Sequence, residues 1–173
     1  GMDPARDVIW IALGTGGRLT SLLTRNVDSV VLGFSDSYLL QTRRHPVHEI
    51  ANIGKEIKML YTGLATTEEL LVKRPDLVGR FLRATVKGRE YLKRYKSQSL
   101  VLGKKYDRSP DDVRSADYDA TMEMMTADGT EDLETQKSDI DIGRRALGIQ
   151  KEIAPQEVFD FRLVREVYKE LRE

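Results

Sequence analysis

The sequence predicts an α/β fold, in which a short parallel βαβ unit precedes a mostly helical C-terminal part. Residues 7–13 form a nearly continuous apolar run rich in β-formers, and residues 27–34 form a second run of this kind. Between the two runs, leucines recur at helical spacing. From Ala65 onward, helical spacing of the apolar residues predominates. We therefore expect two buried parallel strands near the N-terminus and helices after them.

The first predicted strand closes in a glycine-rich turn, the run Gly-Thr-Gly-Gly at 14–17. A helix is expected directly after this turn, because Leu19, Leu22 and Leu23 would share one of its faces. Asn26 is expected to end that helix in a left-handed conformation. The N-terminal segment thus has the order strand, tight turn, helix.

The second predicted strand is followed by Ser35 and Asp36, whose side chains commonly cap helix N-termini. A second helix is expected to continue through Tyr38. Two parallel strands joined by a helix need a right-handed crossover, which brings the turn at 14–17 and the loop at 33–36 to one edge of the sheet. Open α/β sheets bind ligands at that edge, so the two loops together form the candidate ligand site.

The segment after residue 42 is expected to connect this unit to a helical part. A short strand is predicted around 47–53, and the alternating residues 57–62 form a candidate crossover. Thr66 and Glu69 have the spacing of a capping box. The sequence is accordingly divided into residues 1–60, an α/β part, and residues 61–173, a mostly helical part. Further helices are predicted over residues 76–96, after Pro110, over 130–147 with an end near Gly148, and over 160–171.

Composition excludes several classes of function. With 28 basic and 28 acidic residues the formal net charge is zero, so no global field attracts nucleic acid or anionic lipid. The absence of cysteine removes disulfides, thiol nucleophiles and thiolate metal sites. No apolar stretch is long enough for a membrane-spanning helix, and the first residues lack the profile of a signal peptide. We expect a folded domain with no nucleic-acid partner and no membrane insertion.

Catalytic, metal and cofactor sites are not predicted. The turn at 14–17 resembles a dinucleotide-binding loop, but Leu19 stands where the third glycine belongs, so a nucleotide-dependent enzyme is only a minor alternative to a plain turn or a small-ligand anchor. His45 and His48, with a proline between them, lack the spacing of a zinc pair. Asp139 and Asp141 begin like a calcium loop that the following residues do not complete. No nucleophile and base are paired in a recognisable motif, so we expect no enzyme activity.

Three segments carry a resemblance to a known family. Residues 17–32 resemble a segment in which a helix is followed by a small residue, Val, Asp and Ala and then an apolar strand, with Ser29 here in place of the alanine. Residues 66–85 are similar to a helical element with the pattern Pro-x-x-Val-x-x-Phe-x-x-Ala, which begins here at Pro75. Residues 158–164 fit a closing helix. All three belong to solute-binding proteins of ABC importers of the nitrate/sulfonate/bicarbonate type, a group that includes thiamine-pyrimidine binders.

This resemblance implies a fold and a function. The fold would be part of the two-lobed clamshell of a type II periplasmic binding protein, with residues 1–60 in the distal lobe and residues 61–173 in the other. Because the match corresponds to the later part of such proteins, the chain would be an N-terminally truncated member. It would bind a small organic or anionic solute outside the cytoplasm and contact an ABC permease. A ligand-sensing or structural remnant without a transport role is the alternative.

The resemblance also implies which residues contact the ligand. In this family the ligand lies between the lobes, held by strand-end loops and helix N-termini. The corresponding residues of this chain are Thr15, Gly16, Gly17, Arg18, Ser35, Asp36 and Tyr38. Arg18 and the backbone N–H groups would suit an anion, whereas Asp36 and Tyr38 would suit an amine or an aromatic ring.

A homodimer is expected from the apolar faces of the predicted helices. Leu77 and Phe81 lie on one such stripe, and Phe159 and Leu163 lie on another. In the full-length family a further lobe would cover part of these stripes. Without that cover, a second copy of the chain is the expected partner, unless the helices pack against one another instead.

Overall fold

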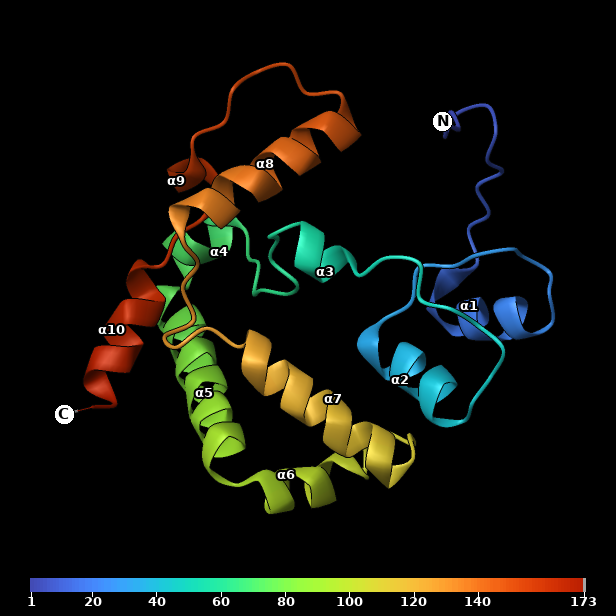
Figure 1. Cartoon of the computed structure of the whole chain (residues 1–173). Helices are drawn as coiled ribbons and strands as arrows, with labels where there is room; N and C mark the ends of the chain where they lie inside the picture. The colour runs from blue at the N-terminus through green and yellow to red at the C-terminus, as the bar shows by residue number, and fades with distance from the viewer. Residues whose placement is uncertain (173) are drawn as a thin grey trace.

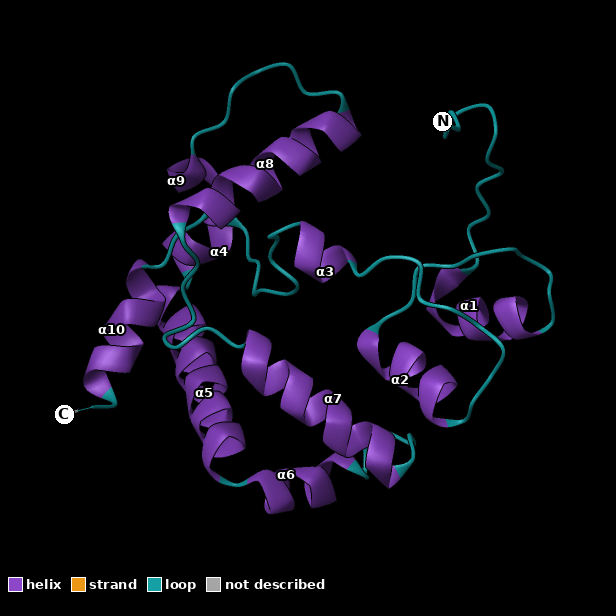
Figure 2. Cartoon of the chain, viewed as in Figure 1, coloured by secondary structure: helices purple, strands orange, loops and turns teal. Residues whose placement is uncertain are grey.

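The computed structural model describes residues 1–172, and within that range all regular secondary structure is helical (Figure 2). The elements in chain order are α1 (Gly14–Leu23), α2 (Phe34–Thr42), α3 (Ile53–Glu56), α4 (Glu68–Lys73), α5 (Pro75–Arg94), α6 (Lys96–Gly103), α7 (Asp111–Met124), α8 (Leu133–Leu147), α9 (Pro155–Val158) and α10 (Arg162–Glu170). Helices α1 and α2 lie on one side, and α5 and α10 lie on the other (Figure 1).

The predicted α/β fold, with its parallel βαβ unit, is wrong. Residues 7–13 and 27–33 have no regular secondary structure, and the residues between them form α1. The predicted strands are also exposed rather than buried, since Ile9 is 88% and Trp10 77% accessible. A stable sheet needs three or more strands or a packed apolar face, and the remaining described residues supply helices instead of further strands. High strand propensity alone is therefore not enough to make strands of these segments, and they are irregular.

The ends of the N-terminal helices also differ from prediction. The glycine-rich run at 14–17 is the first turn of α1 and not a loop, and Gly14 enters it with a φ of 64°. Arg25, rather than Asn26, takes the left-handed conformation after α1, with a φ of 58°. The N–H of Asn26 donates to the Ser21 carbonyl and that of Arg25 to the Leu22 carbonyl, the two bonds of a Schellman motif.

The later helices agree with the sequence in type and differ at some boundaries. Pro75 begins α5 as predicted, and Gly148 ends α8 with a left-handed φ of 67°. The N-cap of α4 is Thr67, whose hydroxyl accepts from the Leu70 N–H, so the predicted capping box beginning at Thr66 is wrong. The strand expected at 47–53 is absent, since those residues are irregular up to the start of α3.

The packed core joins α5 to α10. Val86 of α5 is only 2% exposed and packs with Val167 and Tyr168 of α10, and the half-buried Leu82 and Val164 extend this cluster. Each of these apolar side chains stabilises the fold by about 1.5–3 kcal/mol if fully buried. The apolar stripes of α5 and α10 thus cover one another in part. This packing of helix on helix is what was expected as the alternative to a dimer.

Polar contacts attach the following elements to α5. Arg89 donates to the Thr126 carbonyl over 2.5 Å, and Lys93 donates to the Ala127 carbonyl over 3.1 Å. The hydroxyl of Tyr118 in α7 donates to the Leu92 carbonyl. Helix α5 therefore holds both α7 and the residues that follow α7.

Helix α2 packs on α7 and so links the N-terminal residues to the helical part (Figure 1). Leu40 of α2 and Val113 of α7 are both buried, and Arg43 forms an ion pair of 3.2 Å with Asp112. The hydrogen bond from Arg43 holds the pKa of Asp112 below its usual range. The segment expected as a crossover is attached elsewhere, because the Leu60 N–H donates to the Asp139 carboxylate over 3.1 Å. The assignment of residues 1–60 and 61–173 to separate lobes stays a prediction.

The arrangement leaves much of the chain in contact with solvent. Its accessible surface is 13780 Å². A folded monomer of 19.7 kDa exposes only about 8,600 Å² by the usual scaling with mass. The difference indicates that these helices pack around a small core and leave apolar surface for other contacts. Within residues 1–172, no helix combines the length and apolar character that crossing a bilayer requires.

Glycine-to-alanine substitutions at two helix positions should have opposite effects on stability. Gly148→Ala places a side chain at a φ of 67° and should lower the free energy of unfolding by about 1 kcal/mol. Gly88→Ala lies inside α5 with open space around it and should raise this free energy by about 0.5–1 kcal/mol. Urea denaturation followed by circular dichroism measures both. Two shifts of the same sign would contradict the assigned helix ends.

Candidate functional site

The residues predicted to bind ligand occupy the first turns of two helices. Thr15, Gly16, Gly17 and Arg18 belong to α1, and Ser35, Asp36 and Tyr38 belong to α2. Neither helix has a side chain that caps its N-terminus, so first-turn N–H groups are not satisfied by capping side chains. The sequence placed these residues in loops at the edge of a sheet, and the structure moves them into helix starts.

The first turn of α1 is suited to an anion. It contains no acidic residue, and Thr15 and Gly16 are exposed. A helix N-terminus carries a partial positive charge and free N–H donors, which stabilise negative groups. Arg18 adds a full positive charge one turn along the same helix.

Ser35, Asp36 and Tyr38 in the first turn of α2 have mainly structural partners. The Ser35 hydroxyl donates to the Asp117 carboxylate of α7 over 2.7 Å, so it holds the two helices together. Asp36 places a negative charge at the helix N-terminus, where it interacts favourably with the dipole. The ring of Tyr38 stacks on Phe34, with centroids 5.8 Å apart. An anion is therefore disfavoured here, while an aromatic surface is present.

One hydrogen bond connects the two groups of predicted residues. The Arg18 guanidinium donates to the Val31 carbonyl over 3.3 Å, and Val31 lies three residues before α2 begins. The bond is exposed, so it contributes little to stability by itself. It nevertheless brings the start of α1 close to the segment that leads into α2.

The family of the chain is shown by comparison with known proteins. A family model described as NMT1/THI5 like matches residues 1–98, more than half of the 173 residues. The chain belongs to the NMT1/THI5-like family. This is the family of nitrate/sulfonate/bicarbonate solute-binding proteins of ABC importers, which confirms the resemblance drawn from the sequence. No curated protein and no solved structure matches the chain.

Family membership supports a binding role in general terms. NMT1/THI5-like proteins are mostly solute-binding proteins that act in the periplasm or outside the cytoplasm, although THI5 itself is a thiamine-pyrimidine synthase. The matched residues include α1 to α5 in full and also the start of α6. Both groups of predicted ligand residues thus lie inside the matched region.

Other residues considered from the sequence have no metal-binding arrangement. His45 and His48 are exposed in the irregular segment after α2. Asp139 accepts the Leu60 N–H, and Asp141 forms an ion pair of 3.5 Å with Arg144. Across residues 1–172, no group of three histidine or carboxylate side chains could hold a metal ion.

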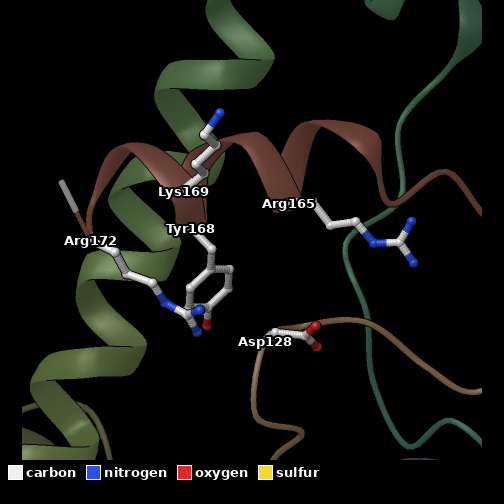
Figure 3. A pocket seen from close by; sticks show the side chains of 5 residues that line it. All are labelled: Asp128, Arg165, Tyr168, Lys169 and Arg172. Atoms are coloured by element: carbon white, nitrogen blue, oxygen red, sulfur yellow. The ribbon is translucent and has the colours of Figure 1, made fainter.

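Two hollows in the surface lie outside the predicted site. One, of about 340 Å³, is formed by α10 and the residues after α7 (Figure 3). The other, of about 380 Å³, lies near α9 and includes Phe159, Phe161 and Asp160. None of the seven predicted ligand residues lines either hollow. Sequence analysis missed both, because their residues are brought together by the packing of helices and not by a motif.

Two charged residues of the larger hollow, Asp160 and Arg162, are paired with each other. Asp160 accepts hydrogen bonds from the backbone N–H and the guanidinium of Arg162, the shortest at 2.7 Å. These bonds lower the pKa of Asp160 to about 2, so its carboxyl group is ionised at any ordinary pH. The stacked rings of Phe159 and Phe161, 6.0 Å apart, give this hollow an aromatic surface, while Gln136, Gln156 and Arg165 add polar groups to its lining.

Ser35→Ala should loosen the packing of α2 on α7. The substitution removes the donor to Asp117, and the free energy of unfolding should fall by about 1 kcal/mol, with faster hydrogen exchange in α2. Ser37→Ala on the same helix is the control, since the Ser37 hydroxyl makes two long, exposed bonds, to Glu49 at 3.4 Å and from Gln41 at 3.5 Å. Equal effects of the two substitutions would show that the Ser35 bond does not hold these helices together.

Proposed function

We propose that this protein is the substrate-binding component of an ABC importer for a small anionic solute. The observation that carries the proposal is the family match, which spans α1 and α2. The geometry supports it, because the first turn of α1 offers N–H groups, the helix dipole and Arg18 with no acidic residue among them. The ligand class is that of the family, nitrate, bicarbonate or a small sulfonate.

The anionic group of the ligand is assigned to α1 and not to α2. Asp36 in the first turn of α2 would repel an anion, and the Ser35 hydroxyl is already bonded to Asp117. Tyr38, stacked on Phe34, instead offers an aromatic surface for the remainder of an organic ligand. The bond from Arg18 to Val31 keeps the two surfaces near each other.

An ABC permease is the proposed protein partner, and the proposed place of action is outside the cytoplasm. Both follow from the family, whose members typically deliver solutes to permeases from that side of the membrane. The chain contributes no spanning helix within residues 1–172, so contact with the permease would use its exposed surface.

Removing the Arg18 guanidinium should weaken binding of a small anion. Arg18→Ala should cost about 1.5–3 kcal/mol in affinity, the range for hydrogen bonds to charged groups. Isothermal calorimetry with nitrate, bicarbonate and methanesulfonate measures the effect. Arg108→Ala removes an equal charge from the loop between α6 and α7 and should leave the affinity unchanged. Unaltered affinity in Arg18→Ala would refute the assignment of α1.

We also propose that two copies associate through the helical part. Leu77 and Phe81 lie on α5 and do not belong to the core cluster that joins α5 to α10, and they remain 38% and 58% exposed. Further large apolar side chains of the helical part, among them Val101 and Val158, are also exposed and could join such an interface. A standard stable interface buries only about 1,600 Å² in total.

Light scattering at micromolar concentration should show a dimer that Phe81→Asp converts to a monomer. The new carboxylate would have to be desolvated in an apolar interface, which strongly disfavours association. Tyr106→Asp is the matched control, because Tyr106 is 90% exposed in the loop after α6. A mass that stays at one chain across the concentration range would exclude the dimer.

A further inference from the structure

The hollow of about 340 Å³ on α10 lies on the opposite side of the molecule from α1 and α2 (Figure 1). Its lining residues are Asp128, Arg165, Tyr168, Lys169 and Arg172 (Figure 3). It has no part in the proposed solute site, and its residues lie beyond the 1–98 region that matches the family. Its volume lies within the range of small-molecule sites.

Tyr168 is the central residue of this hollow. Its side chain is only 7% exposed, and its hydroxyl has no hydrogen-bond partner among the described residues. Burial raises the pKa of Tyr168, so the hydroxyl stays protonated and is a donor at neutral pH. A buried polar group without a partner costs about 1–3 kcal/mol, so an acceptor at this point would be stabilising.

Two guanidinium groups lie beside the Tyr168 ring. The Arg89 and Arg172 carbons Cζ are 6.0 Å and 5.9 Å from the ring centroid, within reach of a cation–π interaction. In the view of Figure 3 the Tyr168 hydroxyl overlaps the guanidinium of Arg172, which lines the same hollow. A buried hydroxyl donor and a bidentate cation thus both belong to the lining of the hollow, and together they have the chemistry that recognises an oxyanion.

The negative charge in the hollow is directed away from the Tyr168 hydroxyl and the Arg172 guanidinium. In Figure 3 the Asp128 carboxylate points to the side on which Arg165 lies. Its Oδ1 accepts from the hydroxyl and the N–H of Thr130, at 2.8 and 3.0 Å. These bonds, and more weakly the charge of Arg165, keep the pKa of Asp128 below its usual range. Three cationic side chains against this one carboxylate leave the lining positively charged.

The wall opposite α10 is fixed in place by α5. Arg89 and Lys93 hold the Thr126 and Ala127 carbonyls, and Gly129 follows with a φ of 74°. A Cβ at Gly129 would lie 2.5 Å from a guanidinium nitrogen of Arg89, so this turn lies close against the Arg89 side chain. The backbone of this wall is therefore held in place by side chains of α5.

We propose that the hollow is a second ligand site, which binds the oxyanion group of a small molecule between the Tyr168 hydroxyl and the Arg172 guanidinium. Arg165 and Lys169 add long-range attraction and define the rim, although Lys169 extends away from the hydroxyl (Figure 3). Phosphate and carboxylate groups share the required chemistry of several acceptor atoms on one negative group. The site is independent of the solute site proposed at α1.

Titration of the full chain with inorganic phosphate tests the proposal, with chloride at equal ionic strength as the reference. Calorimetry should show saturable binding, and in ¹⁵N spectra the amides of the 128–130 turn and of α10 should shift. Tyr168→Phe, which keeps the ring, and Arg172→Gln should each weaken phosphate about tenfold or more. Acetate in a parallel titration distinguishes a carboxylate from a phosphate ligand.

Matched variants separate this site from general charge effects. Tyr106→Phe removes an exposed hydroxyl and Arg108→Gln an equal charge elsewhere, and both should retain the affinity of the unmodified chain within about twofold. Because α1 is itself proposed to bind small anions, Arg18→Ala removes that contribution, and in this variant the amides of the 128–130 turn and of α10 should still shift on titration. A failure of the α1 site is thereby distinguishable from a failure here. Absence of saturable binding of both anions, or equal losses in Arg172→Gln and Arg108→Gln, would overturn the proposal.

Discussion

The packing of α10 against α5 is the contact on which the rest of the helical part depends. Val86 lies between the two helices with Val167 and Tyr168, and Arg83 forms a two-pronged bond to Glu170 farther along. The same twenty-residue helix holds the residues after α7 through Arg89. Loss of this contact would remove both walls of the α10 hollow at once, since one wall is α10 and the other is held by α5.

The N-terminal helices are positioned through a longer and weaker series of contacts. Tyr118 fixes α7 on α5, Ser35 and Arg43 fix α2 on α7, and only Arg18 connects α1 to the segment before α2. The contacts of Arg43 and Arg18 are exposed, and exposed polar contacts contribute about 0–1 kcal/mol each. The solute site at α1 is accordingly less firmly positioned than the hollow at α10, and an anion bridging α1 and its surroundings would add to the forces that hold it.

The sequence predicted helices well where an apolar stripe and a terminal signal coincided. Pro75 begins α5 and Gly148 ends α8, because φ restriction and left-handed freedom act locally and need no partner. Strands were predicted at 7–13 and 27–34 from propensity and apolar content, and these segments are irregular because pairing depends on residues elsewhere in the chain. The family could be identified from the order of residues alone. The α10 hollow could not, since Asp128 and Tyr168 meet only through helix packing.

The single tryptophan of the chain lies far from the packed core. Trp10 is in the irregular segment before α1, where its indole nitrogen donates to the Pro4 carbonyl over 3.1 Å. Indole emission therefore reports on the surroundings of the N-terminal segment, including any partner that covers it. Melting of the α5 and α10 pair would leave that emission unchanged, and it would be detected by helical circular dichroism instead. One chain thus carries two spectroscopically separate probes, one for association and one for the integrity of the core.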